Sequence, residues 1–201
     1  MPQRNITRNY QPACYYHVYN HAVAELRVLY NGSDSRYFLG LITRYLGKEI
    51  AKDKNGTPYK NFSKRLELLA YCLMPNHFHI LLFQNDSYAI QEFMQSIVTA
   101  YSMYFNLKYT RRGAVFESRY KASLIDNDPY LQHIVKYIHQ NPVSQGVEFA
   151  NYPFSSHRQI AGLATGYQWL ATDEVIEIFD NREQYLEYML TRLDSQGSDL
   201  L

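Results

Sequence analysis

The chain has 201 residues, of which 46% are hydrophobic, and a formal net charge of +1. This length can bury a real core and indicates one domain with an extension. The near-neutral charge excludes attraction of nucleic acid by the overall field, so such contacts need local clusters of Lys and Arg. Two cysteines exclude a disulfide scaffold, and no apolar run nears the roughly 20 residues of a membrane span. We therefore expect a soluble cytoplasmic protein without a membrane partner.

Two kinds of pattern alternate along the chain. Runs rich in β-branched and aromatic residues predict strands, and apolar residues at 3.6-residue spacing behind a capping residue predict helices. The turn Met74-Pro75-Asn76 joins two such strands into an antiparallel hairpin. In chain order we expect strands at 15–20, 65–73, 78–83 and 117–125, and helices at 33–46, 90–105, 129–140, 173–179 and 182–193.

Two histidines interrupt the third expected strand. His77 and His79 are two positions apart, so the strand period turns both imidazoles to one face while Phe78 and Ile80 take the other. Such a pair can converge on one metal ion at roughly 2 to 2.2 Å. Two hydrogen-bonded sheet histidines explain the same pattern. His17 on the first strand is likewise either a residue that faces the metal site or a hydrogen-bonded sheet histidine. A third ligand and a reactive group are needed to decide.

The helix at 129–140 supplies a reactive group. Asp128-Pro129 caps its start and Pro142 closes it. At about 100° per residue, Tyr137 and Asn141 lie together at one edge of the buried stripe. A hydroxyl and an amide oxygen therefore point in the same direction.

Cationic and tyrosine side chains cluster between the second long helix and the fourth strand. Lys and Arg can neutralise phosphates, and aromatic rings can stack on unpaired bases. A solvated charged face explains the cluster equally well. The residues that we expect to contact nucleic acid are Arg111, Arg112, Arg119, Tyr120 and Lys121.

Four motifs in a fixed order resemble those of the HUH single-tyrosine transposases of bacterial insertion sequences. The match is closer to one branch, the REP-associated tyrosine transposases. The motifs span residues 71 to 156. They are Tyr71-Cys72-Leu73-Met74-Pro75-Asn76-His77-Phe78-His79-Ile80-Leu81, Arg112-Gly113-Ala114-Val115-Phe116-Glu117-Ser118-Arg119-Tyr120-Lys121, Tyr137-Ile138-His139-Gln140-Asn141-Pro142-Val143 and Tyr152-Pro153-Phe154-Ser155-Ser156.

The resemblance implies a fold and a domain plan. The expected class is α+β, with a ferredoxin-like (RRM-like) antiparallel sheet, helices packed on one face and a helical C-terminal extension. We assign residues 1–145 to the catalytic domain and residues 146–201 to the extension, which either contacts DNA or covers the sheet.

The resemblance also implies an activity. It predicts a metal-dependent endonuclease and strand transferase that acts on single-stranded DNA at hairpins such as REP-like palindromes, as a monomer. Tyr137 would be the nucleophile, leaving a 5′-phosphotyrosine link and a free 3′-OH.

The metal ligands implied are His77, His79 and Asn141. Because Pro142 biases the residue before it away from the helical region, Gln140 stays open as a substitute for Asn141. Phosphate chemistry with an oxygen ligand favours Mg²⁺ or Mn²⁺.

Two other functions remain open from the sequence. One is a nucleic-acid-binding module without chemistry, which uses its tyrosines to stack bases. The other is a zinc-dependent hydrolase, for which no acidic residue adjoins the histidine pair as a general base. One segment departs from the branch: Asn20-His21-Ala22 stands where an arginine-glycine pair is common, which leaves a DNA contact from that loop in doubt.

Overall fold

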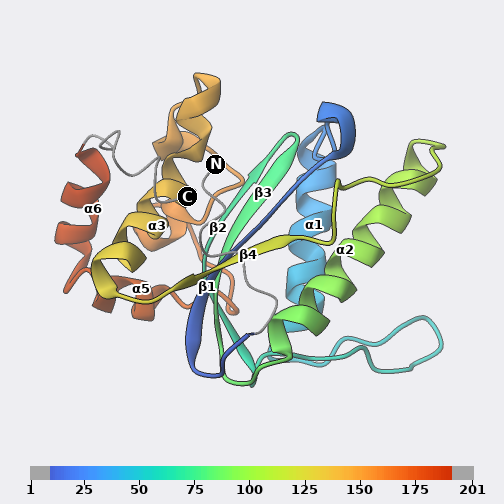
Figure 1. The fold of residues 1–201 in the computed structure, drawn as a ribbon, viewed down its shortest axis with the longest axis horizontal. Helices are drawn as coiled ribbons and strands as arrows, with labels where there is room; N and C mark the ends of the chain where they lie inside the picture. Colours follow the sequence, from blue (N-terminus) through green and yellow to red (C-terminus); the bar gives the residue numbers. More distant parts are fainter. Residues whose placement is uncertain (1–9, 192–201) are drawn as a thin grey trace.

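The computed structural model describes residues 10–191 and contains a four-stranded antiparallel sheet (Figure 1). The strands lie in the order β2-β3-β1-β4, so the histidine strand is one of the two central strands. This order, with a helix after β1 and after β3, is the expected ferredoxin-like arrangement, and the predicted fold class is confirmed. The strands are β1 (Cys14–His21), β2 (Leu66–Met74), β3 (His77–Gln84) and β4 (Lys121–Ile125).

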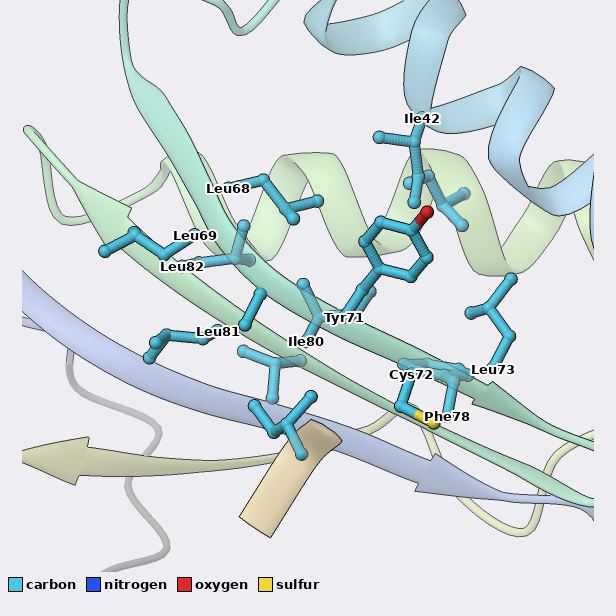
Figure 2. Close-up of a cluster of buried hydrophobic side chains, with 14 of the residues drawn as sticks. Ile42, Leu68, Leu69, Tyr71, Cys72, Leu73, Phe78, Ile80, Leu81 and Leu82 are labelled. Atoms are coloured by element: carbon cyan, nitrogen blue, oxygen red, sulfur yellow. The ribbon is translucent and has the colours of Figure 1, made fainter. Parts of the chain in front are cut away.

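Helices α1 (Gly32–Leu46) and α2 (Ala89–Lys108) pack together on one face of the sheet (Figure 1). Figure 2 shows the apolar cluster beneath them, with Ile42 of α1 above the side chains of β2 and β3. The Phe38 ring lies 5.2 Å from that of Phe78 and 5.1 Å from that of Tyr101. Burying each such side chain contributes roughly 1.5–3 kcal/mol.

The first helix begins slightly earlier than the sequence pattern predicts. Asn31, rather than Ser33 or Asp34, is the cap, and its side-chain oxygen accepts from the backbone N–H of both later residues. Asp34 is buried instead, where it accepts hydrogen bonds from Lys108 Nζ at 2.5 Å and from Tyr104 Oη at 2.9 Å. This carboxylate therefore ties α1 to the last turns of α2.

The opposite face of the sheet carries α3 (Asp128–Gln140) and the chain that follows it (Figure 1). Isolated backbone bridges join Cys72 to Ser155 and Leu68 to Leu170, so this extension is attached to the outer strand β2. The short elements are η1 (Val23–Glu25), η2 (Asn141–Gln145), η3 (Phe149–Asn151), α4 (His157–Ile160), α5 (Thr172–Ile178) and α6 (Arg182–Leu190).

A buried polar chain joins α3 to the extension. His139 Nε2 lies 2.7 Å from Ser156 Oγ, and His139 Nδ1 lies 3.1 Å from Tyr185 Oη. The same tyrosine oxygen lies 2.6 Å from His157 Nδ1. All four side chains are buried, so these hydrogen bonds satisfy groups that would otherwise lose water without compensation.

The start of the fourth strand and the end of the last helix differ from their predicted boundaries. The fourth strand begins at Lys121 instead of residue 117, because the Asn20 side chain occupies the carbonyls of Ser118 and Arg119 in place of a strand ladder. The last helix ends at Leu190, and the predicted residues 192 and 193 lie outside the described range.

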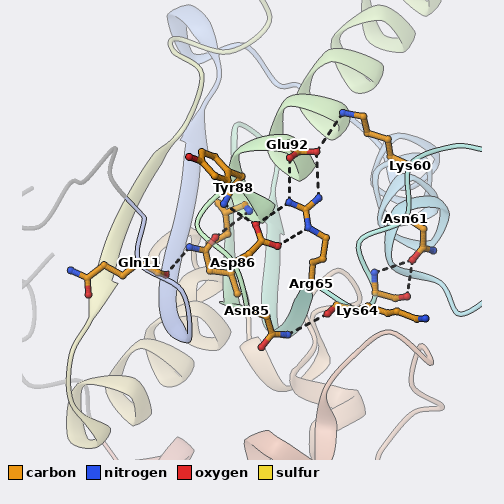
Figure 3. Close-up of polar contacts among 12 residues, drawn as sticks. Gln11, Lys60, Asn61, Lys64, Arg65, Asn85, Asp86, Tyr88 and Glu92 are labelled. Carbon is orange, nitrogen blue, oxygen red and sulfur yellow. Dashed lines mark hydrogen bonds and ion pairs between the residues drawn. The ribbon is translucent and has the colours of Figure 1, made fainter.

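An ionic cluster marks the end of the sheet farthest from the histidines (Figure 3). Arg65 donates to Asp86 through Nε at 2.6 Å and through Nη2 at 2.9 Å, and it also contacts Glu92 at 3.2 Å. The start of β2 is thereby tied to the start of α2. Within residues 10–191, no helix has the length and apolar character needed to cross a membrane.

Candidate active site

Three segments that are distant in the sequence meet on the sheet face beneath α3. The Tyr137 ring stands edge-on to His79 at 5.3 Å and to His17 at 5.8 Å, measured between ring centroids. His77 lies next to His79 at 5.1 Å. The structure therefore brings the predicted nucleophile and both predicted histidine ligands into one place.

The strand period explains the position of the histidines. In β3, Phe78 and Ile80 point into the core under α1 and α2, so His77 and His79 must take the opposite face. The register of β1 places Tyr19 directly beside His79. The α3 helix lies over this polar strip because its own apolar stripe needs the sheet.

Asn141, which the resemblance implies as a third ligand, contacts His77. Its side-chain oxygen lies 2.8 Å from His77 Nε2. The expectation that Pro142 would turn Asn141 out of the helical region is wrong, since its backbone is helical at φ −52° and ψ −37°. The pre-proline position disfavours that conformation without forbidding it, and here α3 runs directly into the tighter turn η2.

Gln140 does not reach the histidines. Its side-chain nitrogen donates to the carbonyl oxygen of Met189 at 2.6 Å, on the side of α3 that faces the extension. Helical geometry accounts for this, because adjacent residues project about 100° apart around the axis. Of the two amides that the sequence left open, the structure brings only Asn141 to the site.

Burial governs the ionisation of the site. It lowers the pKa of His17 to about 3 and that of His79 well below the usual value. Burial also lowers the pKa of His77, against the opposing hydrogen bond from Asn141. The histidines are therefore neutral near pH 7, which is the state in which imidazole nitrogen can bind a metal.

The phenol of Tyr137 is harder to ionise than a free one. Burial raises its pKa most, Tyr19 adds to the increase, and a hydrogen bond with Asn141 opposes it. The Tyr137 side chain, which belongs to α3, is half-buried. Proton loss from Tyr137 therefore needs help from a group that arrives with the substrate or the metal.

The residues present fit a small divalent cation. Two ligands at about 2.1 Å from one ion and at right angles are about 3 Å apart, and His77 Nε2 and Asn141 Oδ1 are separated by 2.8 Å. Among residues 10–191, no group of three or more His, Cys, Asp or Glu side chains could hold a metal ion. The side-chain oxygen beside the histidine pair is that of Asn141.

Two histidines of β1 adjoin the site. His17 Nε2 lies 2.9 Å from His79 Nδ1. From the sequence, both a metal ligand and a hydrogen-bonded sheet histidine were open for His17. His21, which sequence reasoning missed as a site residue, stacks on His77 at 4.9 Å between centroids. The alternation of His17, Tyr19 and His21 along one strand face was the available signal, but it needed the β1–β3 register to have meaning.

The predicted DNA-contacting residues lie at different distances from this centre. Lys121 Nζ lies 5.9 Å from the Tyr19 ring, which itself stacks against His79. Arg111 packs over Phe105 at the end of α2 instead. Arg112 and Arg119 are exposed. The Tyr120 hydroxyl accepts a hydrogen bond from the Tyr10 hydroxyl.

Comparison with known proteins finds one family model and two solved structures that are similar to this chain. Residues 46–141 match the family model described as "Transposase IS200 like". The fold is similar to a REP-associated tyrosine transposase bound to a REP hairpin, with 19% identity, a TM-score of 0.53, and coverage of 84% of this chain and 96% of that chain. A candidate transposase from Deinococcus radiodurans R1 is also similar, at 16% identity, a TM-score of 0.41 and coverage of 66% and 92%. A search of curated protein sequences gives no significant match.

The family model matches residues 46–141, and the solved structure shares the fold. Both matches support the resemblance carried by the motifs of residues 71 to 156.

Proposed function

We propose that this protein is a metal-dependent endonuclease and strand transferase for single-stranded DNA, with Tyr137 as its nucleophile. The observation that carries the proposal is the approach of Tyr137 to His79 at 5.3 Å, beside the contact of His77 with Asn141 at 2.8 Å. Since the similar solved structure holds a REP hairpin, the proposed substrate is DNA with such a palindrome. All proposed catalytic groups lie in one chain, which supports a monomer.

The proposed reaction exchanges one phosphate ester for another. The Tyr137 oxygen loses its proton and attacks phosphorus, and a bond from this oxygen to phosphorus forms as the bond to the 3′ oxygen breaks. That 3′ oxygen takes up a proton and leaves as a 3′-OH, while the 5′ phosphate stays on the tyrosine. Because the ester keeps the bond energy, a 3′-OH can later reverse the step and join strands.

Each site residue has a distinct proposed task. His77 and His79, through Nε2, and Asn141, through its side-chain oxygen, would hold a divalent metal, Mg²⁺ or Mn²⁺. When bound, this ion supplies positive charge against the negative charge that develops on the phosphate oxygens. The Tyr137 ring of α3 lies 5.3 Å from that of His79, which supports its proposed role, since phosphoryl transfer requires a positioned nucleophile.

The proposed DNA surface runs from the end of α2 to β4. Lys121 lies closest to the centre, beside Tyr19, and suits the phosphate next to the cleaved bond. The exposed arginines beyond Lys121 suit the phosphates of the flanking DNA backbone. The residues proposed for this surface are Arg111, Arg112, Arg119, Tyr120 and Lys121.

The test is a covalent adduct whose polarity is read from the label. A hairpin DNA with a single-stranded flank is labelled at its 3′ end in one sample and at its 5′ end in another, and incubated with the full chain and Mn²⁺. On a denaturing gel, the 3′-labelled fragment should migrate with the protein, and the 5′-labelled fragment should be short and free.

Two matched tyrosine variants complete the design. Tyr137→Phe should abolish the adduct by at least about 10³-fold while DNA binding stays unchanged. Tyr130→Phe, on the same helix two turns earlier, should leave the adduct intact. An adduct that survives Tyr137→Phe contradicts the proposed nucleophile, and the absence of an adduct with every divalent metal supports the non-catalytic binding module instead.

A further inference from the structure

The two proposed metal-binding histidines each have a partner on the ring nitrogen Nδ1. His79 Nδ1 lies 2.9 Å from Nε2 of His17, and the two rings are nearly parallel at 20°. His77 Nδ1 lies 2.8 Å from the side-chain oxygen of Asn76. In both histidines, the nitrogen left for the site is therefore Nε2.

A neutral imidazole carries one proton, so its two nitrogens cannot both donate. Both rings are buried, and Nε2 of His17 faces Nδ1 of His79. Across the 2.9 Å contact, one ring must donate and the other must accept. If His17 donates, the proton of His79 sits on Nε2 and blocks that nitrogen as a ligand; if His79 donates, its Nε2 keeps a lone pair.

We propose that His17 is a positioning residue: it accepts a hydrogen bond from His79 Nδ1–H and so fixes the tautomer of His79 that presents a lone pair at Nε2. This proposal rests on the proposed function, since a ligand role for His79 requires that tautomer. His77 lies between two amide oxygens, of Asn76 at Nδ1 and of Asn141 at Nε2, and both can only accept, so the proposal concerns the tautomer of His79 alone. Metal-binding histidines commonly have such partners, although a second histidine in place of a carbonyl or carboxylate is unusual.

The cost of this arrangement falls on His17 itself. In the proposed tautomer its own proton lies on Nδ1, which is buried and has no hydrogen-bond partner among residues 10–191. An unpaired buried polar atom opposes folding. An apolar ring at this position would avoid this cost, whereas the His17 imidazole makes the contact with His79 at 2.9 Å.

The first measurement needs no metal and no substrate. Nitrogen-15 NMR of the metal-free, full-length protein distinguishes a protonated ring nitrogen from one with a lone pair, and the His79 signals are assigned by their loss in His79→Gln. We expect a protonated Nδ1 and an unprotonated Nε2. The opposite assignment, with the proton on Nε2, overturns the proposal.

The second measurement compares three substitutions on β1 by Mn²⁺ binding, followed by the electron paramagnetic resonance signal of free Mn²⁺. His17→Phe keeps a ring but has no acceptor, and it should weaken Mn²⁺ binding by about 10- to 100-fold. His17→Gln places an amide oxygen near the former Nε2 and should restore most of the affinity. Tyr15→Phe, on the same strand face, should bind as the wild type does.

The outcomes separate this proposal from the function on which it rests. Equal Mn²⁺ binding by wild type, His17→Phe and His17→Gln overturns the positioning role while leaving the metal site intact. A wild type that binds no Mn²⁺, yet shows the expected His79 tautomer, overturns the metal site and with it the purpose assigned to His17. A merely structural role for His17 would lower stability in both His17 variants and give no rescue of affinity by glutamine.

Discussion

The two faces of this sheet are attached to their helices by different chemistry. Under α1 and α2 the contacts are apolar and aromatic, such as Phe38 against Phe78 at 5.2 Å. Under α3 and the extension they include buried hydrogen bonds, such as Tyr185 Oη with His157 Nδ1 at 2.6 Å. The same strands serve both faces because successive side chains alternate.

This difference separates two requirements of an enzyme. Burial of apolar area stabilises without a fixed direction, which suits a scaffold. Hydrogen bonds have a required direction and distance, and α3 must hold Tyr137 in one orientation. Besides the chain from His139 through Tyr185, Gln132 Nε2 and Gln140 Nε2 both donate to carbonyls of the extension at 2.6 Å. The extension therefore covers the sheet and also fixes the helix that carries the proposed nucleophile.

The largest expected effect is on the apolar face. Phe78→Ala should lower the free energy of unfolding by about 3–5 kcal/mol, because the side chain is fully buried and leaves a cavity against Phe38. Urea denaturation measures this loss. As a control, Leu190→Ala at an exposed position should stay within about 0.5 kcal/mol of wild type. A loss below about 1 kcal/mol for Phe78→Ala would contradict the role given to this face.

The next-largest effect is expected from removing a hydrogen bond on the polar face. Tyr185→Phe removes the hydroxyl shared by His139 and His157, and it should cost about 1–3 kcal/mol because buried ring nitrogens lose their partner. Hydrogen exchange of the α3 amides should become faster while that of β3 changes little. Tyr167→Phe, whose ring is partly exposed, is the control. Equal acceleration in α3 and β3 would mean that the network holds the whole fold and not this helix.

Acid should weaken the polar face selectively. Burial lowers the pKa of His157 from 6.5 to about 4, so the unfolded chain binds more protons than the folded one between these values. The stability contribution is present above pH 6.5 and is lost as the pH falls towards 4. The slope for one such histidine is at most about 1.4 kcal/mol per pH unit.

Urea denaturation across this pH range tests the assignment. His157→Gln should flatten the dependence of unfolding free energy on pH, while Phe78→Ala should shift the whole curve without changing its slope. A slope in His157→Gln that equals the wild-type slope would show that other groups are responsible.

The smallest expected effect concerns the ionic cluster of Figure 3. Glu92→Gln weakens one partner of Arg65, whose bonds to Asp86 remain. Because these side chains are about one-third exposed, the loss should be under about 1 kcal/mol and should shrink in high salt. A larger loss, independent of salt, would place this cluster among the buried determinants of the scaffold face.

The sequence by itself determined the elements and their faces. The alternation through Phe78 assigned both site histidines to one side of β3, and the spacing of Tyr137 and Asn141 assigned both side chains to one edge of α3. These results follow from the periods of strand and helix, which are local. The motif order then predicted the fold class, which the structure confirms.

Only the tertiary structure decided what lies opposite each of these residues. The period cannot say that Gln140 would meet the carbonyl of Met189, or that His17 would face His79, since both depend on packing and on strand register. The N-cap of α1 is likewise Asn31, and the Asp34 carboxylate accepts a hydrogen bond from Lys108 of α2. Sequence patterns fix the direction of a side chain within its element, and contacts between elements fix its partner.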